Sequence, residues 1–428
     1  MKFVFFIRHY NDADQILPFI SYLSYNKKAE IIVYTLNKED QISSHISYIN
    51  NVLNIKVINF YDNFYHSYFD SAVLKTSQKL SKIRLSNKNK IVKHIGMILV
   101  IKARNVMHFI LSKKIARFIG KLSKDDVVMG DFATENYFPH KYLISYSQNK
   151  SIRIVAWMHG FYVFSNLDST KATDFENIKK NIIKWILYKY IYKKKSANYY
   201  DCYIVANYLK NTYFKSSMFD SFEKHNRVIE IGMPRYTYEW NNEYHKTILK
   251  GQKFEYKTND KINVVMFLSS EKFNVNNKKL KETLFDLSLC KNINFVYKPH
   301  TRATSTVLEN MQINALNCID TNSVLLSEWA DIGIIYGCSI GFQLLLDDTL
   351  LILPTYIDSN RTVFEDNNVC YQAKSLRGLI DFISNKSKEE IHQFIQRENV
   401  SNFIESYAYG GRDYNGLMES YYKCAIKK

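Results

Sequence analysis

Four side chains able to bind an anion follow one short apolar stretch of the sequence. The stretch at 293–297 is rich in β-branched and aromatic residues, and Pro299 then stops the strand because proline cannot donate to a ladder. The residues around this proline supply an ammonium group, an imidazole, a hydroxyl and a guanidinium: Lys298, His300, Thr301 and Arg302. Ligands of open parallel α/β sheets bind just beyond the carboxyl ends of strands, so these groups indicate a phosphate site. The alternative is an ordinary charged turn between a strand and a helix.

A second apolar stretch, 332–336, ends in small residues. Tyr336 closes this stretch, and Gly337 and Ser339 follow it before a helix expected near Phe342. Small residues let backbone N–H groups approach an anion, and the N-terminus of a helix attracts negative charge. A cationic loop beside a small, hydroxylated loop therefore predicts a cradle for the phosphates of a ligand.

Two histidines at other strand ends could take up a proton. His159, with Gly160 beside it, directly follows the apolar run 152–157, and histidine is the side chain best able to accept a proton near neutral pH. His9 follows the first apolar run, 3–7, and is the weaker candidate. Either histidine could instead occupy a turn and have no chemical role.

Two acids lie close behind His9. Asp12 and Asp14 have the spacing of a metal-binding pair, but they come directly before an expected helix, and capping that helix explains them better. Asp14 is also a further candidate for the general base. The sequence thus predicts no metal site and no cofactor.

Two later turns could bind the remainder of a nucleotide. The segment 232–235, Gly-Met-Pro-Arg, combines a flexible turn with a guanidinium, Arg235, that could meet a phosphate. The loop after Pro354 is polar and long for an α/β connection, and it carries Glu365. Carboxylates at such positions accept hydrogen bonds from ribose hydroxyls. A plain turn and a solvated surface loop are the respective alternatives.

Several classes of protein are disfavoured by what the sequence lacks. It contains no GxGxxG after a strand, no GxxxxGK[ST] and no GxSxG, which argues against a dehydrogenase, a P-loop ATPase and an α/β-hydrolase. The 6 cysteines are scattered without a CxxC pair. That distribution favours a reducing compartment over a disulfide framework or a structural zinc.

The elements that must position these residues alternate between strands and helices, which predicts parallel sheets. Expected strands lie at 3–7, 31–35, 55–60, 126–129, 152–157, 203–206, 228–231, 262–267, 293–297, 332–336 and 350–353. Expected helices lie from 16 to 25, over most of 72–124, and at 277–289, 322–330, 340–346, 376–396 and 413–425. The fold class is therefore α/β, with two Rossmann-like, doubly wound domains that face each other across a cleft.

Domain boundaries follow from the break in this pattern. An N-terminal, acceptor-side domain is expected at 1–240 with basic helical segments, and a polar linker at 241–260. A nucleotide-donor domain is expected at 261–410, followed by a C-terminal helix, 411–428, that could cross back to the first domain.

The formal charge of +17 is concentrated in two segments. Residues 71–124 contain no acid and 14 Lys or Arg, and the acid-free run 177–200 carries 7 lysines among aromatic residues. Nucleic acid or an anionic membrane would suit this charge, and the apolar content favours basic amphipathic helices on a membrane surface. Two solvated helix faces are the alternative. The N-terminus reads as a buried strand, and no stretch reaches the ~18 apolar residues that span a bilayer, so we expect a cytoplasmic protein bound peripherally to the inner face of the membrane.

Five motifs occur in an order that resembles one family. They are His-Gly at 159–160, Gly-x-Pro-Arg at 232–235, Lys-Pro-His-x-Arg at 298–302, Tyr-Gly-Cys-Ser at 336–339 and Pro-Thr-Tyr at 354–356. The set resembles bacterial GT-B glycosyltransferases of surface polysaccharide assembly, above all the CDP-glycerol glycerophosphotransferases of teichoic-acid and capsule synthesis. The Kdo and sialic acid transferases that use CMP-sugars share the Lys-Pro-His element. The resemblance covers about 150–370 in pattern and the preceding residues in architecture.

The resemblance implies roles for several residues. The C-terminal domain would bind the donor, with its phosphates held by Lys298, His300 and Arg302, while the N-terminal domain would receive the acceptor. Ser339 would complete the anion site, and His159 would face the reacting centre from the other domain. The chain departs from the glycerophosphotransferases at Tyr336-Gly-Cys-Ser339, where they have an acid-Tyr-Ser-Ser loop, and at His300-Thr301, where they have His-Pro. These departures leave open a CMP-, CDP- or UDP-linked donor.

The expected function is transfer of a sugar from a nucleotide-activated donor to a growing, lipid-linked surface polysaccharide such as capsule or O-antigen, without a metal. Two alternatives share the architecture: transfer of glycerol phosphate or another polyol phosphate from a CDP-linked donor, and 2-epimerisation of a UDP-sugar. A third alternative, a nucleic-acid-binding protein, uses the acid-free stretch, but the sequence shows no recognisable reading helix, so we expect no nucleic-acid partner.

Overall fold

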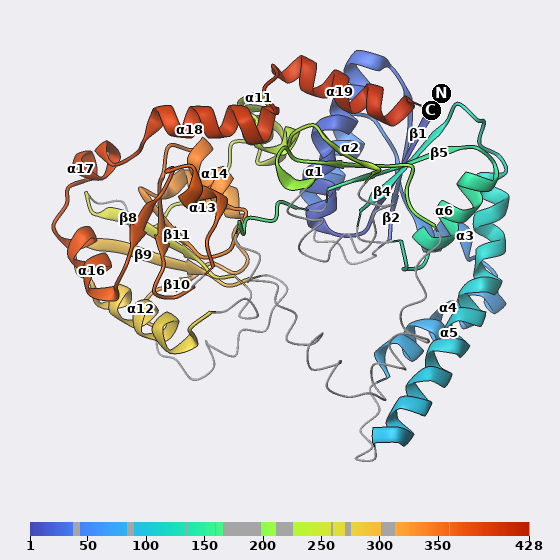
Figure 1. Ribbon diagram of the computed structural model, residues 1–428, viewed down its shortest axis with the longest axis horizontal. Coiled ribbons are helices and arrows are strands. Elements are labelled where there is room, and N and C mark those ends of the chain that lie inside the picture. The colour runs from blue at the N-terminus through green and yellow to red at the C-terminus, as the bar shows by residue number, and fades with distance from the viewer. Residues whose placement is uncertain are drawn as a thin grey trace.

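Two parallel β-sheets flanked by helices form the chain in the computed structural model (Figure 1). The structure describes residues 1–36, 43–83, 90–132, 135–158, 160–165, 198–210, 226–257, 260–269, 275–300, 313–358 and 360–427. The predicted α/β class with two Rossmann-like domains is confirmed.

The first sheet has seven parallel strands within the described residues, in the order β3-β2-β1-β4-β5-β6-β7. Their bounds are β1 (Lys2–Ile7), β2 (Glu30–Thr35), β3 (Val57–Asn59), β4 (Val127–Asp131), β5 (Arg153–Trp157), β6 (Cys202–Val205) and β7 (Val228–Glu230). Phe3 and Phe5 of β1 pack into one core cluster, while Val4 and Phe6 point into the other. Burial on both faces explains why the strands read as nearly continuous apolar runs.

Helices connect these strands and cover the sheet. They are α1 (Tyr10–Tyr22) with a π-helical continuation η1 (Leu23–Lys27), α2 (Ser43–Asn51), α3 (Phe60–Phe64), α4 (Tyr68–Lys82), α5 (Lys90–Ile119) and α6 (His140–Asn149). Asp12 caps the start of α1, because its Oδ2 accepts the backbone N–H of His9 at 3.0 Å. Asp12 and Asp14 lie inside the first turns of α1, earlier than the helix start expected at 16, and Asp12 has the capping role that the sequence indicated.

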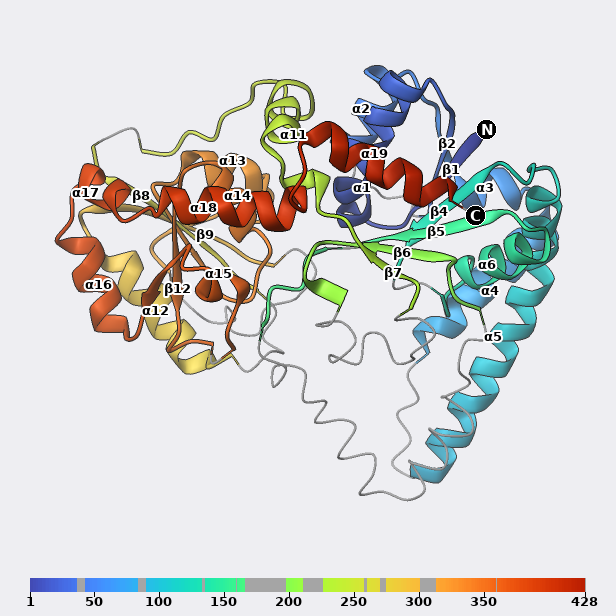
Figure 2. The ribbon, with the colours of Figure 1, turned by 45° about the horizontal axis from the view of Figure 1, so that its top comes forward.

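Helices α4 and α5 form a hairpin that projects from the first domain (Figures 1 and 2). By length and composition, Ile95–Ile119 of α5 is the one segment among the described helices that could cross a membrane, and 11% of its most apolar window is buried. This corrects the expectation that no stretch is long and apolar enough. The expectation counted uninterrupted apolar residues, and Lys102 and Arg104 interrupt the run.

The second sheet has six parallel strands in the part of the chain that the structure describes, in the order β10-β9-β8-β11-β12-β13. The strands are β8 (Ile262–Phe267), β9 (Ile293–Lys298), β10 (Leu316–Asn317), β11 (Ile332–Ile335), β12 (Leu350–Pro354) and β13 (Tyr371–Ala373). The helices are α12 (Asn277–Leu289), α13 (Ser323–Trp329), α14 (Gly341–Leu346), α15 (Val363–Asp366), α16 (Leu376–Ser384) and α17 (Lys388–Gln393). The carboxyl ends of β11 and β12 lie side by side, since these strands pair in parallel.

The connection between the two sheets is helical where a polar linker was expected. It contains η4 (Pro234–Tyr236), α11 (Tyr238–Glu243) and a π-helical turn η5 (Tyr244–Ile248). Trp240 and Tyr244 are buried in the same core cluster as β1 and α1. The start of the expected linker, 241–260, is therefore part of the first domain's core. The sequence pattern concealed this because only a few large aromatic residues anchor the segment.

The end of the chain returns to the first domain. Helix α18 (Arg397–Ile404) lies on the second domain and continues through η7 (Glu405–Tyr409), after which α19 (Tyr414–Ile426) lies on the first domain (Figure 2). The hydroxyl of Tyr421 donates to the carbonyl of Gly232 at 2.9 Å, and the Arg153 guanidinium donates to the carbonyl of Cys424 at 3.2 Å. These bonds tie the last helix to the first domain.

Candidate nucleotide-binding site

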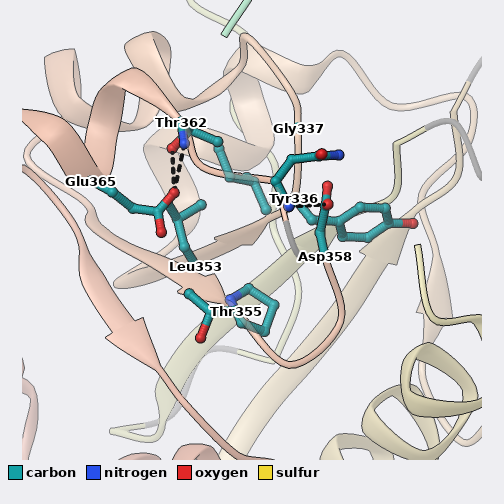
Figure 3. Close-up of a pocket in the computed structure, with 10 residues that line it drawn as sticks. Tyr336, Gly337, Leu353, Thr355, Asp358, Thr362 and Glu365 are labelled. Atoms are coloured by element: carbon teal, nitrogen blue, oxygen red, sulfur yellow. Dashed lines mark hydrogen bonds between the residues drawn. The ribbon is translucent and has the colours of Figure 1, made fainter. Parts of the chain in front are cut away.

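A pocket opens at the carboxyl ends of β11 and β12 in the second domain (Figure 3). The loop after β11 supplies Tyr336 and Gly337, and the loop between β12 and α15 supplies polar side chains. The lining residues with polar side chains are Tyr336, Thr355, Asp358, Asn360, Thr362 and Glu365. This is the position at which open parallel sheets bind ligands.

Glu365 stands in the wall of the pocket in a fixed orientation. Its Oε2 accepts the backbone N–H of Thr362 at 2.7 Å and the hydroxyl of the same residue at 3.1 Å (Figure 3). This capping box holds the start of α15, and it also fixes the carboxylate where it lines both this pocket and an adjoining hollow with Arg361 and Gln372. The sequence predicted a ligand-binding role for Glu365, and its position at the pocket is compatible with that role.

Asp358 is a second carboxyl group in the same pocket. Burial, aided by the nearby charge of Glu365, raises the pKa of Asp358 to about 6, although the backbone N–H of Asn360 donates to its Oδ1 at 2.9 Å. The side chain can therefore change protonation just below neutral pH, and it can either donate or accept a hydrogen bond. Asp358 was not among the sequence-predicted site residues, although the length and polarity of its loop were the signal that could have found it.

A segment of the first domain packs against residues that line this pocket. After β5 the chain runs through residues 161–165 and pairs with the loop that carries Thr362. The N–H of Ser165 donates to the carbonyl of Arg361 at 2.9 Å, and the N–H of Val363 donates to the carbonyl of Val163 at 2.9 Å. We call residues 161–165 the strap, because they join the two domains beside the pocket.

Phe164 of the strap occupies the space that a side chain at position 337 would need. Gly337 has φ = +57°, a left-handed conformation, and a Cβ added there would lie 2.4 Å from Cζ of Phe164. Phe161, which is also in the strap, packs edge-on against Phe342 of α14, with ring centroids 4.8 Å apart. Glycine is therefore required at 337 both for its backbone angle and for the approach of the strap.

The predicted phosphate-binding residues after β9 are only partly described. Thr301 and Arg302 lie outside the described residues, while His300 is half-buried at the end of β9. Lys298 is buried, and its Nζ donates to the carbonyls of Cys318, Ile319 and Thr321 at 3.2, 2.8 and 2.6 Å. Burial lowers the pKa of Lys298, yet its three donors are directed to backbone oxygens. This geometry favours a structural role for Lys298 over the predicted contact with a donor phosphate.

Arg235 and Asp14 form a buried ion pair away from the pocket lining. Arg235 is 3% exposed, and its Nε lies 2.6 Å from Oδ1 of Asp14. Burial alone would raise the pKa of Asp14, but the charge of Arg235 and a contact with His45 outweigh that effect, and the pKa lies below its ordinary value. A carboxylate held in this way is a poor proton acceptor. The structure thus favours a structural role for both residues, in place of the predicted phosphate contact and general base.

The same guanidinium links the two domains. Nη1 of Arg235 donates to Oε1 of Gln343 in α14 at 3.2 Å, and Nε2 of Gln343 donates to Oδ1 of Asn241 at 2.8 Å. The next residue, Tyr236, forms a hydrogen bond with Ser339, and burial raises the pKa of its phenol to about 12. Ser339 therefore meets the first domain at the edge of the small-residue loop.

The two histidines expected to act as bases have different outcomes. His159 lies outside the described residues, but it directly precedes Gly160 and the strap. His9 is the N-cap of α1, and its backbone N–H donates to Oδ2 of Asp12 at 3.0 Å. Its role as a base stays a prediction.

Sequence reasoning missed a polar group at the carboxyl edge of the first sheet. Arg8, after β1, donates from Nη2 to Oδ2 of the fully buried Asp131 at 2.7 Å. His140 lies beside Gly130, and burial, together with the charge of Arg8, lowers its pKa to about 3. Neither ring nitrogen of His140 has a hydrogen-bond partner in the described part of the chain. His140 starts a helix after Phe138-Pro139, and nothing in that local pattern distinguishes it from a capping residue.

Metal ligands were not expected. Among the described residues, no group of three or more His, Cys, Asp or Glu side chains is placed to hold a metal ion.

Comparison with known proteins supplies a fold but no family. The sequence matches no protein-family model and no curated protein. The UDP-GlcNAc 2-epimerase of Neisseria meningitidis, solved with UDP-GlcNAc, is similar in structure with a TM-score of 0.53 at 13% identity, covering 100% of both chains. The glycosyltransferase of kitacinnamycin has a TM-score of 0.51 at 10% identity, covering 98% of this chain and 97% of its own.

A third solved structure is similar to this chain as well. The N-terminal domain of trehalose-6-phosphate phosphatase from Candida albicans has a TM-score of 0.50 at 10% identity, covering 100% of this chain and 97% of its own. These likenesses show the GT-B fold, as the sequence predicted. Because an epimerase and a transferase both share it, the fold alone does not distinguish their reactions.

Proposed function

We propose that the chain transfers a glycosyl group from a nucleotide-activated donor to an acceptor held by the first domain. The observation that carries this proposal is the pocket at the ends of β11 and β12, whose wall contains Gly337 and a Glu365 carboxylate fixed in orientation. A fixed carboxylate at a parallel strand end suits the hydroxyls of a ribose, and Asp358 can donate or accept a hydrogen bond to the same nucleoside. The structurally similar epimerase of Neisseria meningitidis was solved with UDP-GlcNAc, which supports this choice of ligand class.

The phosphates of the donor would lie between the loop at 337–341 and the end of β9. His300, Thr301 and Arg302 follow β9, and Ser339 precedes α14. Cations and backbone dipoles that are already in place can stabilise the charge on a departing phosphate, so the reaction we propose needs no metal. Lys298 supports this region because its ammonium group donates to three backbone carbonyls of the loop 318–321.

Proton transfer is assigned to His159. It follows β5 of the first domain and precedes the strap, which ends at the donor pocket. In this role it would accept the proton of the acceptor hydroxyl as that oxygen attacks the anomeric carbon and the nucleotide leaves. We propose a lipid-linked surface polysaccharide as the acceptor and the cytoplasmic face of the membrane as the place of reaction.

A nucleotide panel tests the donor site. Thermal unfolding is measured with CMP, CDP, UMP, UDP and GDP on the wild type, on Glu365→Gln and on the matched control Glu282→Gln, which changes a glutamate on the exposed surface of α12. One pyrimidine nucleotide is expected to stabilise the wild type and the control, by roughly 2.7 kcal/mol at a hundred times its dissociation constant. The stabilisation should fall in Glu365→Gln. Equal stabilisation of all three proteins would show that Glu365 does not bind the nucleotide. If no nucleotide stabilises any of the three proteins, the donor site is refuted.

A UDP-sugar 2-epimerase is the second candidate, favoured by the structural likeness to such an enzyme. The two functions differ in their need for an acceptor. Incubation with UDP-GlcNAc alone, followed by proton NMR, distinguishes them, because an epimerase produces the 2-epimer without any second substrate. Transfer of a polyol phosphate from a CDP-linked donor shares the fold as well, and stabilisation by CDP but not by UDP would favour it.

A further inference from the structure

Helix α5 carries an exposed apolar stripe along the α4–α5 hairpin. Its members are Ile95, Leu99, Val106 and Phe109, whose side chains are 55%, 62%, 60% and 59% exposed. The steps of four, seven and three residues put them on one side of the helix, and the exposed Lys102 fills the gap in the same line. We call these four residues the α5 stripe.

The two ends of α5 have different environments. Leu111, Ile115 and Ile119 are buried in the first core cluster, which anchors the C-terminal part of the helix. Near the same end, the hydroxyl of Tyr65 donates to the carbonyl of Leu111 at 3.1 Å, and Lys114 pairs with Asp70 of α4. The α5 stripe lies on the part of the hairpin that projects from the domain (Figures 1 and 2). The hairpin is thus fixed at its base and exposes apolar side chains further out.

The charge around the stripe has one sign. Residues 71–124 contain 14 Lys or Arg and no acid. On α4, Lys75, Lys79 and Lys82 are exposed at steps of four and three, which puts them on one face of that helix. Exposed apolar side chains among lysines suit a membrane interface, because the long lysine stems, that of Lys102 included, can extend past the apolar boundary to the head groups.

We infer that the α4–α5 hairpin binds the surface of an anionic bilayer, with the α5 stripe inserted at the boundary between head groups and acyl chains. Lysines of both helices would lie among the phosphates of the lipids. A transmembrane orientation does not fit, because Leu111, Ile115 and Ile119 of the apolar segment Ile95–Ile119 are buried in the domain core. The rest of that segment, 95–110, extends about 24 Å, short of the ~30 Å hydrocarbon core. The helix therefore lies along the interface.

Charge favours a bilayer over the other occupants. A second copy of this surface would bring two acid-free, lysine-rich faces together, which Coulomb repulsion opposes. Nucleic acid would satisfy the lysines, but it gives no reason for four large apolar side chains to be exposed. This inference names the membrane as the partner of the proposed transferase, and it depends on that function only for the acceptor that the membrane would present.

Vesicle flotation tests the hairpin. The full chain is mixed with vesicles of equal parts phosphatidylglycerol and phosphatidylcholine, or of phosphatidylcholine alone. The variants are Leu99→Asp and Phe109→Asp, and the matched controls are Leu289→Asp and Phe285→Asp on the exposed surface of α12, where these residues are 56% and 47% exposed. We expect the wild type and both controls to float with the anionic vesicles, and each stripe variant to bind at least about tenfold more weakly.

Insertion and simple adsorption are separated by a fluorescence measurement. The fluorescence of the Phe109→Trp variant should be quenched by lipids brominated on the acyl chains beyond the background of the 4 native tryptophans, whereas that of Phe285→Trp should not. The inference is overturned if the wild type fails to float, if the stripe variants float as well as the controls, or if bromine quenches the Phe109→Trp variant no more than the wild type. It is also overturned if the stripe variants convert a dimer to a monomer without any change in flotation, since the stripe would then be a contact between copies.

The controls separate this inference from the proposed function. Circular dichroism shows whether each variant folds, and the nucleotide panel shows whether its donor pocket is intact. Flotation without any nucleotide-dependent stabilisation would sustain the membrane surface and refute the proposed donor site. Nucleotide-dependent stabilisation without flotation would sustain the proposed donor site and refute the membrane surface.

Discussion

The contact between the strap and the donor pocket can be tested at Gly337. A Cβ at this position would lie 2.4 Å from Cζ and 2.8 Å from Cε1 of Phe164, at a backbone φ of +57°. An L-residue in the left-handed region costs roughly 1–2 kcal/mol, and overpacking of a well-filled site costs typically about 1–3 kcal/mol. We therefore expect Gly337→Ala to lower the free energy of unfolding by about 2–5 kcal/mol.

The chain offers a matched control for the backbone contribution. Gly251 has φ = +69°, and a Cβ there would meet nothing within 4 Å. Gly251→Ala should therefore cost only the roughly 1–2 kcal/mol of the left-handed conformation. Both substitutions remove the same glycine flexibility from the unfolded chain, so the difference between the two variants isolates the collision with Phe164.

The assay is urea denaturation of both variants, extended to a double-mutant cycle with Phe164→Leu. The smaller side chain should relieve part of the collision, so the cost of Gly337→Ala should fall by about 1 kcal/mol or more in the Phe164→Leu background. Gly337→Ala should also lose nucleotide-dependent stabilisation, because the strap pairs with the loop that carries Thr362, whereas Gly251→Ala should keep it. Equal costs for Gly337→Ala and Gly251→Ala would refute the close approach of the strap.

Three further predictions concern buried ionisable groups. The folded-state pKa of Asp358 is raised to about 6, so the folded protein holds this proton at pH values where the unfolded chain has lost it, and stability attributable to Asp358 should decline as pH rises from about 4 to about 6. Comparison of Asp358→Asn with the wild type should show that decline only in the wild type, and parallel pH profiles would contradict the assignment. Arg235→Met leaves Asp14 buried without its cation and should cost about 3–5 kcal/mol in chemical denaturation, with nucleotide-dependent stabilisation retained. If Arg235→Met is stable but is no longer stabilised by nucleotide, Arg235 binds the donor as the sequence predicted. Lys298→Met leaves three carbonyls without their donor and should lower stability by about 1–3 kcal/mol or more, and an unchanged denaturation midpoint would argue that the ammonium is free to bind phosphate.

Strands were the most predictable feature of this chain. Each strand with both faces buried is a dense apolar run, as in Ile262–Phe267, whose bounds agree with the expectation. The strands that were missed, Leu316–Asn317 and Tyr371–Ala373, are short, and they lie at the two edges of the second sheet. An edge strand is held by backbone pairing with one neighbour, and that leaves little trace in side-chain pattern.

The direction in which a polar side chain points was much harder to predict. Lys298 ends β9, Arg235 lies in the short turn η4 and Asp14 lies in the second turn of α1, yet each is directed to a partner within the protein. Those partners are distant in sequence, and no local spacing reveals them. Glu365 differs because its partner, Thr362, lies three residues away in a capping box that the sequence already contains.

Long-range contacts also explain the residues that were overlooked. The strap reaches the pocket through main-chain hydrogen bonds between 163–165 and 361–363, which any sequence could make. Asp131 was overlooked because its partner, Arg8, is distant in the sequence. The two residues meet only because β1 and β4 are neighbours in the sheet. Sheet order is a property of the whole fold, so it could not be read from the motifs.

The claim that the second domain binds a nucleotide donor is tested most directly by photo-crosslinking. Azido-substituted uridine and cytidine diphosphates are irradiated with the wild type and with Glu365→Gln, and the modified peptides are identified by mass spectrometry. We expect labelling within 336–337 or 355–372, the segments that line the pocket, and weaker labelling in the variant. Labelling confined to the first domain, or equal in both proteins, would contradict a donor site at the ends of β11 and β12.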